Sequence, residues 1–386
     1  MAKVKITGHA SGSGVITVTA PNTSTDRTIT LPDSTGTILD NTSTLDATKL
    51  SGNLPAISAA SLTNVPKDVT VGGRKNIVMN GAFQVWQRGT SFTADADAFG
   101  ADRWAITRPN QTVTKEIASI GNIRCNSMKM LKTGGGAITG YYSIEDGTGV
   151  SAGGSLFNGK TLTLSYYARA SGSFDNNGQV WLYYNNKSTS VQVATCTDSL
   201  STSWTKFTHT FTMPTNTQTY ANVYSLTLSL IRALDGNVGN SDWVEVAQVQ
   251  LEESPVATDF EHRSYGEELA LCQRYYQRIT QSAGDFYIMA SKGQSSDTTR
   301  FAQTLAVPLR ASPTISQGGG FSGWRCFRGT SGVLSSTSTP ATLGFVENAG
   351  FVSLQVAGFS GLTDNYFYGT SPSFTSSGYF DMDSEL

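Results

Sequence analysis

The first forty residues alternate apolar and small polar side chains in three short runs. The runs KVKITG, GVITVTA and RTITLP have the period of two that places one face of a strand in a core. Turn-forming residues at 11–14 and 21–22 separate them, and another turn at 33–36 follows the last run. A β unit of about 40 residues is difficult to stabilise without disulfide bonds, metal ions or partner chains. Residues 1–40 are therefore expected to fold only beside identical neighbours.

From residue 41 the pattern changes to single apolar residues spaced three to five positions apart. This spacing matches neither a sustained heptad nor strict alternation. Isolated apolar side chains cannot form a core within one chain, but identical chains that wrap about a shared axis can bury them. The pattern thus predicts a shaft of intertwined identical chains over 41–73, with a disordered linker as the alternative. The candidate shaft residues are Leu45, Leu50, Leu54, Ile57, Leu62 and Val65.

The rest of the chain is rich in alternating segments separated by turn residues. Runs such as TLTLSYYARA and DWVEVAQVQLEE predict an antiparallel jelly-roll sandwich over 74–262. Residues 263–280 have apolar residues at helical spacing and acidic residues in the first turn, which predicts a connecting helix. Strand-like runs return over 281–386 and predict a second, smaller β-sandwich domain. The expected fold class is mainly β.

Charge and composition exclude several classes of function. Only 15% of the residues are charged, and 27 Lys and Arg against 29 Asp and Glu give a net charge of −2. Nucleic-acid binding is not expected, because no basic surplus exists to neutralise phosphates. No apolar run approaches the roughly 20 residues of a membrane span, so no membrane insertion is expected. The first residues also lack the apolar segment of a secretory signal.

Catalytic and metal-binding patterns are not found. The three histidines, His9, His209 and His262, are far apart in sequence, and a G-x-S-x-G match at 149–153 lies between turn-like segments. The four cysteines show no zinc spacing, so free thiols are expected. We therefore predict no enzyme and no cofactor. Sequence cannot place two carboxylates at glycosidase distance, so a glycan depolymerase stays an alternative.

One acidic segment is a candidate site for a structural calcium ion. Asp95, Asp97 and Asp102 supply the carboxylate oxygens that hard cations prefer. The other interpretation is a solvated loop in which Asp102 and its neighbour Arg103 make structural polar contacts.

Sugar binding is the chemistry that the composition favours. It uses aromatic faces against the apolar side of the ring and neutral hydrogen-bonding groups at its rim. Aromatic residues beside polar ones occur in the jelly-roll region and again near the C-terminal end, although each group also fits an ordinary buried strand face. The candidate glycan- or receptor-binding residues are Trp181, Tyr183, Trp324, Arg325, Arg328, Asn365, Tyr366 and Tyr368.

Three stretches resemble parts of bacteriophage tail-fibre proteins. RTITLPDSTGTILD with the following LDATKLSGNLPAISAASLTNVP is similar to their N-terminal and shaft repeats. NIVMNGAFQVWQRGTSF and VQLEESPVATDFEHRSYGEELALCQRYYQR resemble the two ends of a jelly-roll module like carbohydrate-binding modules. AVPLRASPTI looks like the opening of a fibre tip domain. About one shaft repeat is present, which implies a short fibre.

The resemblance implies a non-enzymatic homotrimer in the virion tail, made in the host bacterial cytoplasm. Its N-terminal segment would attach to tail or other virion proteins, and its distal part would recognise a bacterial surface polysaccharide during host adsorption. A head or tail decoration protein with no receptor contact is the structural alternative.

Overall fold

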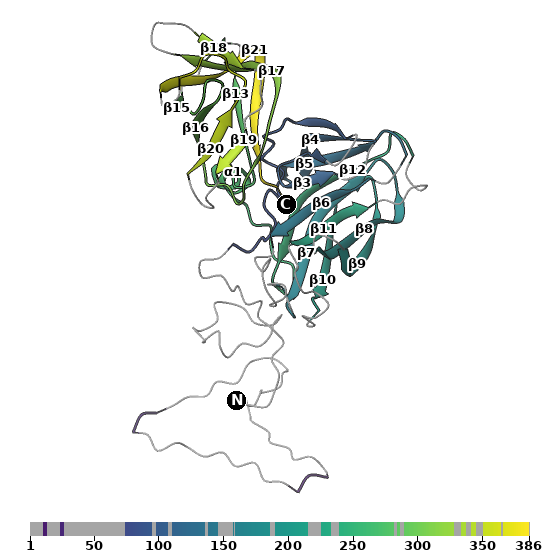
Figure 1. Ribbon diagram of the computed structural model, residues 1–386. Coiled ribbons are helices and arrows are strands. Elements are labelled where there is room, and N and C mark those ends of the chain that lie inside the picture. The colour runs from purple at the N-terminus through teal and green to yellow at the C-terminus, as the bar shows by residue number, and fades with distance from the viewer. Residues whose placement is uncertain are drawn as a thin grey trace. The chain divides into compact units, whose positions relative to one another are not determined.

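The computed structural model divides the chain into two compact units, residues 1–63 and 64–386. The predicted N-terminal β segment and the shaft residues lie outside the described residues, except for 11–13 and 24–26. All helices and strands described here belong to the second unit (Figure 1). The described residues are 11–13, 24–26, 74–94, 98–106, 110–135, 138–145, 157, 159–185, 190–214, 225–232, 239–281, 284–285, 289–327, 333–336, 341–344, 350–363 and 366–385.

Two antiparallel six-stranded sheets form a sandwich within the region predicted as a jelly roll, and the mainly β fold class is confirmed. In order across the first sheet, the strands are β1 (Ser91–Ala94), β4 (Gln111–Ile120), β5 (Ile123–Lys132), β12 (Trp243–Glu252), β7 (Thr161–Ala170) and β10 (Thr205–Thr212). Across the second sheet they are β2 (Ala98–Phe99), β3 (Trp104–Ile106), β6 (Gly140–Glu145), β11 (Ser225–Arg232), β8 (Phe174–Asn185) and β9 (Ser190–Leu200).

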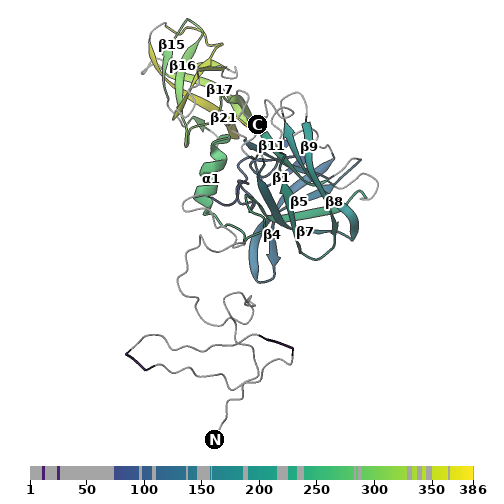
Figure 2. The same ribbon diagram turned by 90° about the horizontal axis from the view of Figure 1, so that it is seen from below.

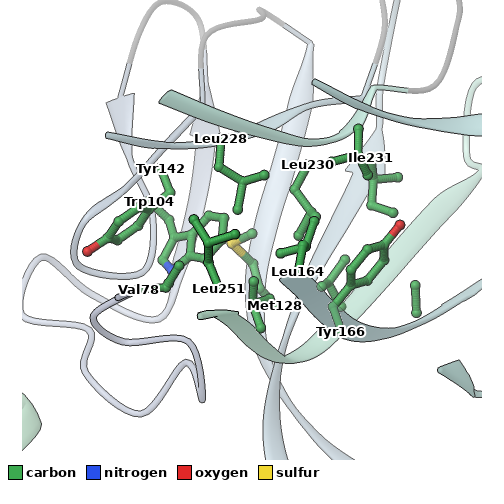
Figure 3. Close-up of a cluster of buried hydrophobic side chains, with 14 of the residues drawn as sticks. Val78, Trp104, Met128, Tyr142, Leu164, Tyr166, Leu228, Leu230, Ile231 and Leu251 are labelled. Atoms are coloured by element: carbon green, nitrogen blue, oxygen red, sulfur yellow. The ribbon is translucent and has the colours of Figure 1, made fainter. Parts of the chain in front are cut away.

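The sandwich core follows from the alternation in the sequence. Leu226, Leu228 and Leu230 of β11 are fully buried, and they face Leu164 and other buried side chains of the first sheet. Figure 3 shows Leu228, Leu230 and Leu164 meeting between the two layers. Each fully buried side chain of this size stabilises the fold by about 2 kcal/mol, so the sandwich has an extensive core of its own.

The two ends of the sandwich are hydrogen-bonded to each other. The Ile77 N–H donates to the Leu251 carbonyl (2.8 Å), and the Val249 N–H donates to the Gly81 carbonyl (2.9 Å). The Asn76 side chain donates to the Val249 carbonyl and accepts from the Leu251 N–H. A Cβ on Gly81 would lie 2.1 Å from the Val249 carbonyl oxygen, so only glycine fits. The two stretches that resemble module ends therefore lie together.

A buried carboxylate joins the edge strands of the two sheets. Asp198 of β9 accepts hydrogen bonds from the Tyr166 hydroxyl of β7 and from Nε2 of His209 on β10 (2.8 Å). Tyr166 is fully buried and Asp198 is 6% exposed. Burial and the neighbouring Asp198 carboxylate raise the pKa of Tyr166 well above its ordinary value, which keeps the hydroxyl protonated as a donor.

Replacing Asp198 by alanine is expected to lower the free energy of unfolding by about 2–3 kcal/mol, because the Tyr166 hydroxyl would be left buried without its acceptor. Urea unfolding measures this loss. The exposed pair between Glu253 and Lys160 provides the control, and Glu253→Ala should cost less than about 1 kcal/mol. Equal effects of the two substitutions would contradict the structural role of Asp198.

One helix, α1 (Tyr265–Gln273), leads from the sandwich into the C-terminal sheet (Figure 2). The Ser264 hydroxyl caps it by accepting from the Glu267 N–H. The helix predicted over 263–280 is too long, because Tyr276–Gln281 is strand β13 and pairs with the end of the chain. Among the described residues no helix is long and apolar enough to cross a membrane.

The strands of the C-terminal domain pair into one sheet. Its order is β18 (Val333–Ser336), β17 (Thr314–Phe327), β21 (Phe367–Asp383), β15 (Met289–Gly293), β16 (Thr299–Thr304), β20 (Phe351–Val356) and β19 (Ala341–Gly344), and β13 and β14 (Gly284–Asp285) also pair with β21. The rings of Trp324 on β17 and Phe301 on β16 are 5.2 Å apart. In a flat sheet strands in these positions would be about 14 Å apart, so the sheet curls around its core.

Alternating acidic residues near the end of the chain pair with three arginines. The pairs are Asp381 with Arg278, Asp383 with Arg88, and Glu385 with Arg103. Arg88 and Arg103 belong to the sandwich, whereas the acidic residues belong to the C-terminal domain. Ion pairs thus tie the last strand to the sandwich.

Candidate functional site

Strand β8 has one apolar and one mixed face. Val180 and Leu182 are fully buried in the sandwich core. Because successive side chains on a strand point to opposite faces, Gln179, Trp181 and Tyr183 lie on the other side of the second sheet. Trp181 and Tyr183 are half-buried, and their ring centroids are 5.6 Å apart in an edge-on arrangement. The aromatic pair proposed from the sequence therefore lies outside the core.

Neighbouring strands add hydroxyl groups to this surface. On β11, Ser229 pairs with Trp181 and Thr227 pairs with Tyr183. On β9, Thr195 pairs with Trp181 and Thr197 pairs with Gln179. Paired residues on adjacent strands share a face. We name this surface the β8 face, and it comprises Gln179, Trp181, Tyr183, Thr195, Thr197, Thr227 and Ser229.

Two polar atoms of the β8 face are buried and make no hydrogen bond. Ser229 is completely buried although it points away from the sandwich core, and its Oγ has no partner. The Oε1 atom of Gln179 is also buried and has no hydrogen-bond partner. A buried polar group without a partner costs about 1–3 kcal/mol, and native proteins contain few of them. A ligand that displaced the side chains covering these atoms could supply their missing hydrogen bonds.

The outer face of the first sheet differs in its chemistry. The Lys129 ammonium lies 4.6 Å from the Trp243 ring centroid, and the Arg169 guanidinium lies 4.9 Å from that of Trp204. Arg169 also pairs with the buried Glu245 carboxylate (2.7 Å). Cations therefore occupy the indole faces on this side of the sandwich.

Two of the C-terminal candidates are core residues, and their proposed role in surface recognition is corrected. Trp324 is 1% exposed, and its ring packs against Phe301 and Phe380. Tyr368 is 3% exposed, and its hydroxyl accepts from the Thr363 N–H (2.7 Å). Both side chains point into the curl of the sheet, where aromatic residues fill volume.

The other C-terminal candidates do not gather into one described site. Arg325 is exposed on the side of β17 opposite to its neighbour Trp324. Tyr366 is 41% exposed, and its ring centroid lies 5.2 Å from that of Tyr368. Arg328 and Asn365 lie outside the described residues.

Three of the residues considered for catalysis or metal binding, His209, His262 and Asp102, lie in the described part of the chain. His209 bonds to Asp198, and the ring of His262 packs edge-on against Phe260 (5.0 Å). Asp102 is buried and accepts hydrogen bonds from the Gln87 backbone and side chain. His9, Asp95, Asp97 and the 149–153 segment lie outside the described residues. Within the described part of the chain, no three His, Cys, Asp or Glu residues are grouped to hold a metal ion.

All four cysteines are free thiols. Burial, with Asp198 nearby, raises the pKa of Cys196 to about 12, and burial also raises the pKa of Cys125, Cys272 and Cys326. These thiols stay protonated near neutral pH and are poor nucleophiles.

Sequence reasoning missed Gln179, Thr227 and Ser229. The alternation in SLTLSL marks Thr227 and Ser229 as the polar side of a strand. Their position beside Trp181 and Tyr183 depends on the pairing of β8 with β11, about 45 residues apart in the chain. Only the sheet register brings these groups together.

No family model and no curated protein matches the chain. Among solved structures, it is similar to a candidate sugar-binding protein from Bacteroides thetaiotaomicron VPI-5482, with 13% identity, 46% of this chain and 100% of that chain covered, and a TM-score of 0.32. The CBM22-1 xylan-binding domain of Paenibacillus barcinonensis Xyn10C is 12% identical over 44% of this chain and 94% of that chain, with a TM-score of 0.28.

The enzymatically active domain of bacteriophage CBA120 tailspike protein 4 is also similar. It is 12% identical over 46% of this chain and 21% of that chain, with a TM-score of 0.28. The interpretation of the β8 face rests on its own geometry.

Proposed function

We propose that the β8 face binds a neutral glycan without catalysing its cleavage. The observation that carries this proposal is the burial of two unpartnered polar atoms, Ser229 Oγ and Gln179 Oε1, beside the rings of Trp181 and Tyr183. A sugar ring presents C–H groups to an aromatic surface and hydroxyls to polar atoms at its edge. The net charge of −2 is compatible with an uncharged ligand.

In the wider proposal, the chain is a trimeric receptor-binding fibre of a tailed bacteriophage. The sequence resemblance supports this role, and the hydrogen-bonded ends of the sandwich agree with the module boundaries that the resemblance implies. The N-terminal segment would attach to the virion, and the distal domains would contact a bacterial surface polysaccharide. Three copies of a weak sugar site gain avidity through effective concentration, so each site need not bind tightly.

A glycan screen with matched variants tests the binding proposal. Trp181→Ala should weaken glycan binding at least about tenfold, which is a loss of 1.4 kcal/mol, because the ring platform is removed. Trp204→Ala is the control, since Trp204 lies on the first sheet beneath Arg169 and should leave binding unchanged.

Three outcomes would contradict the proposal. Equal binding by wild type and Trp181→Ala would move the glycan site away from the β8 face. Release of oligosaccharides from the bound polysaccharide would show a depolymerase. If no cell or glycan is bound and the protein is located on the capsid, the decoration role is favoured instead.

A further inference from the structure

The C-terminal domain contains a cavity of about 400 Å³ that is separate from the β8 face. It lies between the end of α1, strands β13 and β16, and the inner side of β17 and β21. This volume is in the lower part of the range for small-molecule sites, which run from roughly 300 to 1,000 Å³. It suits one or two rings better than an extended polymer chain.

Part of the cavity lining is apolar and rigid. Trp324, Phe380, Ile279 and Met382 all contribute. The Trp324 ring packs edge-on against Phe380 at 5.7 Å and is tilted against Phe301 at 5.2 Å. These contacts hold the indole in place. Trp324, Phe380 and Met382 are only 1–2% exposed, so they form the packed base of the cavity, and Ile279 is the more exposed apolar group.

One wall is fixed by the side chain of Gln277. Its Nε2 donates to the carbonyls of Gln273 (3.1 Å) and Val307 (2.6 Å). Its Oε1 accepts from the Ala306 N–H (2.9 Å). These three bonds connect the end of α1, strand β13 and the segment after β16. The cavity is therefore preformed, and binding does not require this wall to be ordered.

Unused hydrogen-bonding groups also line the cavity. The side chains of Gln273 and Thr304 make no hydrogen bond to any other described residue. Gln303 donates from Nε2 to the Thr304 carbonyl (2.7 Å), which leaves its Oε1 as an acceptor. Because successive side chains on β16 point to opposite faces, Thr304 lies on the outer face with Phe351, so the amides of Gln273 and Gln303 are the groups that can donate to and accept from a ligand.

The charge in the cavity is balanced. Arg278 is its one charged lining residue, and its guanidinium forms two hydrogen bonds with the Asp381 carboxylate, both 2.7 Å long. It also donates to the Arg88 carbonyl (3.0 Å). An anionic ligand would have to compete with Asp381 for this guanidinium, so the cavity favours an uncharged ligand.

We propose that this cavity is a second binding site and that it takes a single neutral pyranose unit. The apolar lining would contact the C–H groups of the sugar, and the amides of Gln273 and Gln303 would bond to its hydroxyls. The site differs from the β8 face in position and size. A polymer strand could run along the strands of the β8 face, whereas the cavity would select a terminal or branching sugar. The two proposals can fail independently.

Fluorine NMR of the full chain labelled with 5-fluorotryptophan tests this site. The chain has six tryptophans, so Trp324→Phe and Trp181→Phe assign the two relevant signals by their loss. A panel of neutral methyl pyranosides should contain at least one that shifts the Trp324 signal in a saturable titration and leaves the Trp181 signal in place.

The variant Gln273→Ala with Gln303→Ala should weaken this binding about tenfold. Gln355→Ala is the matched control, because Gln355 bonds to Arg300 outside the cavity and its loss should not change the affinity. The proposal is overturned if no pyranoside shifts the Trp324 signal. It is also overturned if the double variant binds as tightly as wild type, or if indole moves the signal while every sugar fails to do so.

Discussion

Glu385→Ala is expected to lower the free energy of unfolding by about 3–5 kcal/mol, because it leaves the buried charge of Arg103 unpaired. The side chains of Arg103 and Glu385 are 1% and 4% exposed. The Arg103 guanidinium also lies 3.6 Å from the Tyr275 ring centroid, so it cannot turn towards water without losing that contact. Burial by itself would lower the pKa of Arg103, but the Glu385 carboxylate outweighs it and the pKa is raised.

Guanidinium chloride unfolding and calorimetry measure this effect. Because the pair ties the sandwich to the C-terminal domain, its loss should also split one thermal transition into two. Glu267→Ala is the control, since the Glu267 pair with Arg74 is exposed and should contribute less than about 1 kcal/mol. A loss below 1 kcal/mol for Glu385→Ala would show that Arg103 finds another partner or is hydrated.

Leu50→Asp combined with Leu54→Asp is expected to abolish the trimer. Three copies of each carboxylate would be placed near one axis, where burial of their charge costs several kcal/mol per ion. The protein should change from three times the chain mass of 41.1 kDa to a single chain. Sedimentation equilibrium or mass photometry measures the change.

Ser51→Asp is the matched control for the shaft. It adds the same charge between the two leucines, at a position that is not among the candidate shaft residues. The control should remain trimeric. If the double leucine variant also remains trimeric, the candidate shaft residues do not form a shared core, and the fibre proposal loses its basis for assembly.

The sandwich is the part of the fold that the sequence predicted most closely. Leu226, Leu228 and Leu230 alternate with small polar residues, and this period alone identifies their strand and its buried face. Local alternation does not reveal which strand lies alongside. The hydroxyl groups opposite Trp181 could therefore not be predicted, because they depend on pairing between distant segments.

The predicted end of the helix was wrong for a related reason. YYQRIT allows both helical and strand spacing, and the alternative is decided by β21, whose last residues pair with Tyr276–Gln281. A domain boundary at 280–281 would separate β13 from the sheet that it belongs to. A deletion intended to remove the C-terminal domain should therefore begin after Arg274.

Aromatic residues were the least predictable part of the candidate site. Trp181 and Trp324 both occur in strand-like segments with polar neighbours. Trp324 points into a curled sheet and is buried, whereas Trp181 is half-buried on the outer side of a sandwich sheet. The difference arises from the curvature of the C-terminal sheet, which brings together strands that are not neighbours in it and is not encoded in any short segment.

A crystal structure of the protein with a glycan identified in the screen would test the central claim most directly. We expect a sugar ring against Trp181 and Tyr183, with one hydroxyl within about 3 Å of Ser229 Oγ or Gln179 Oε1. A glycan bound elsewhere, with both atoms still without a partner, would contradict the assignment of the β8 face.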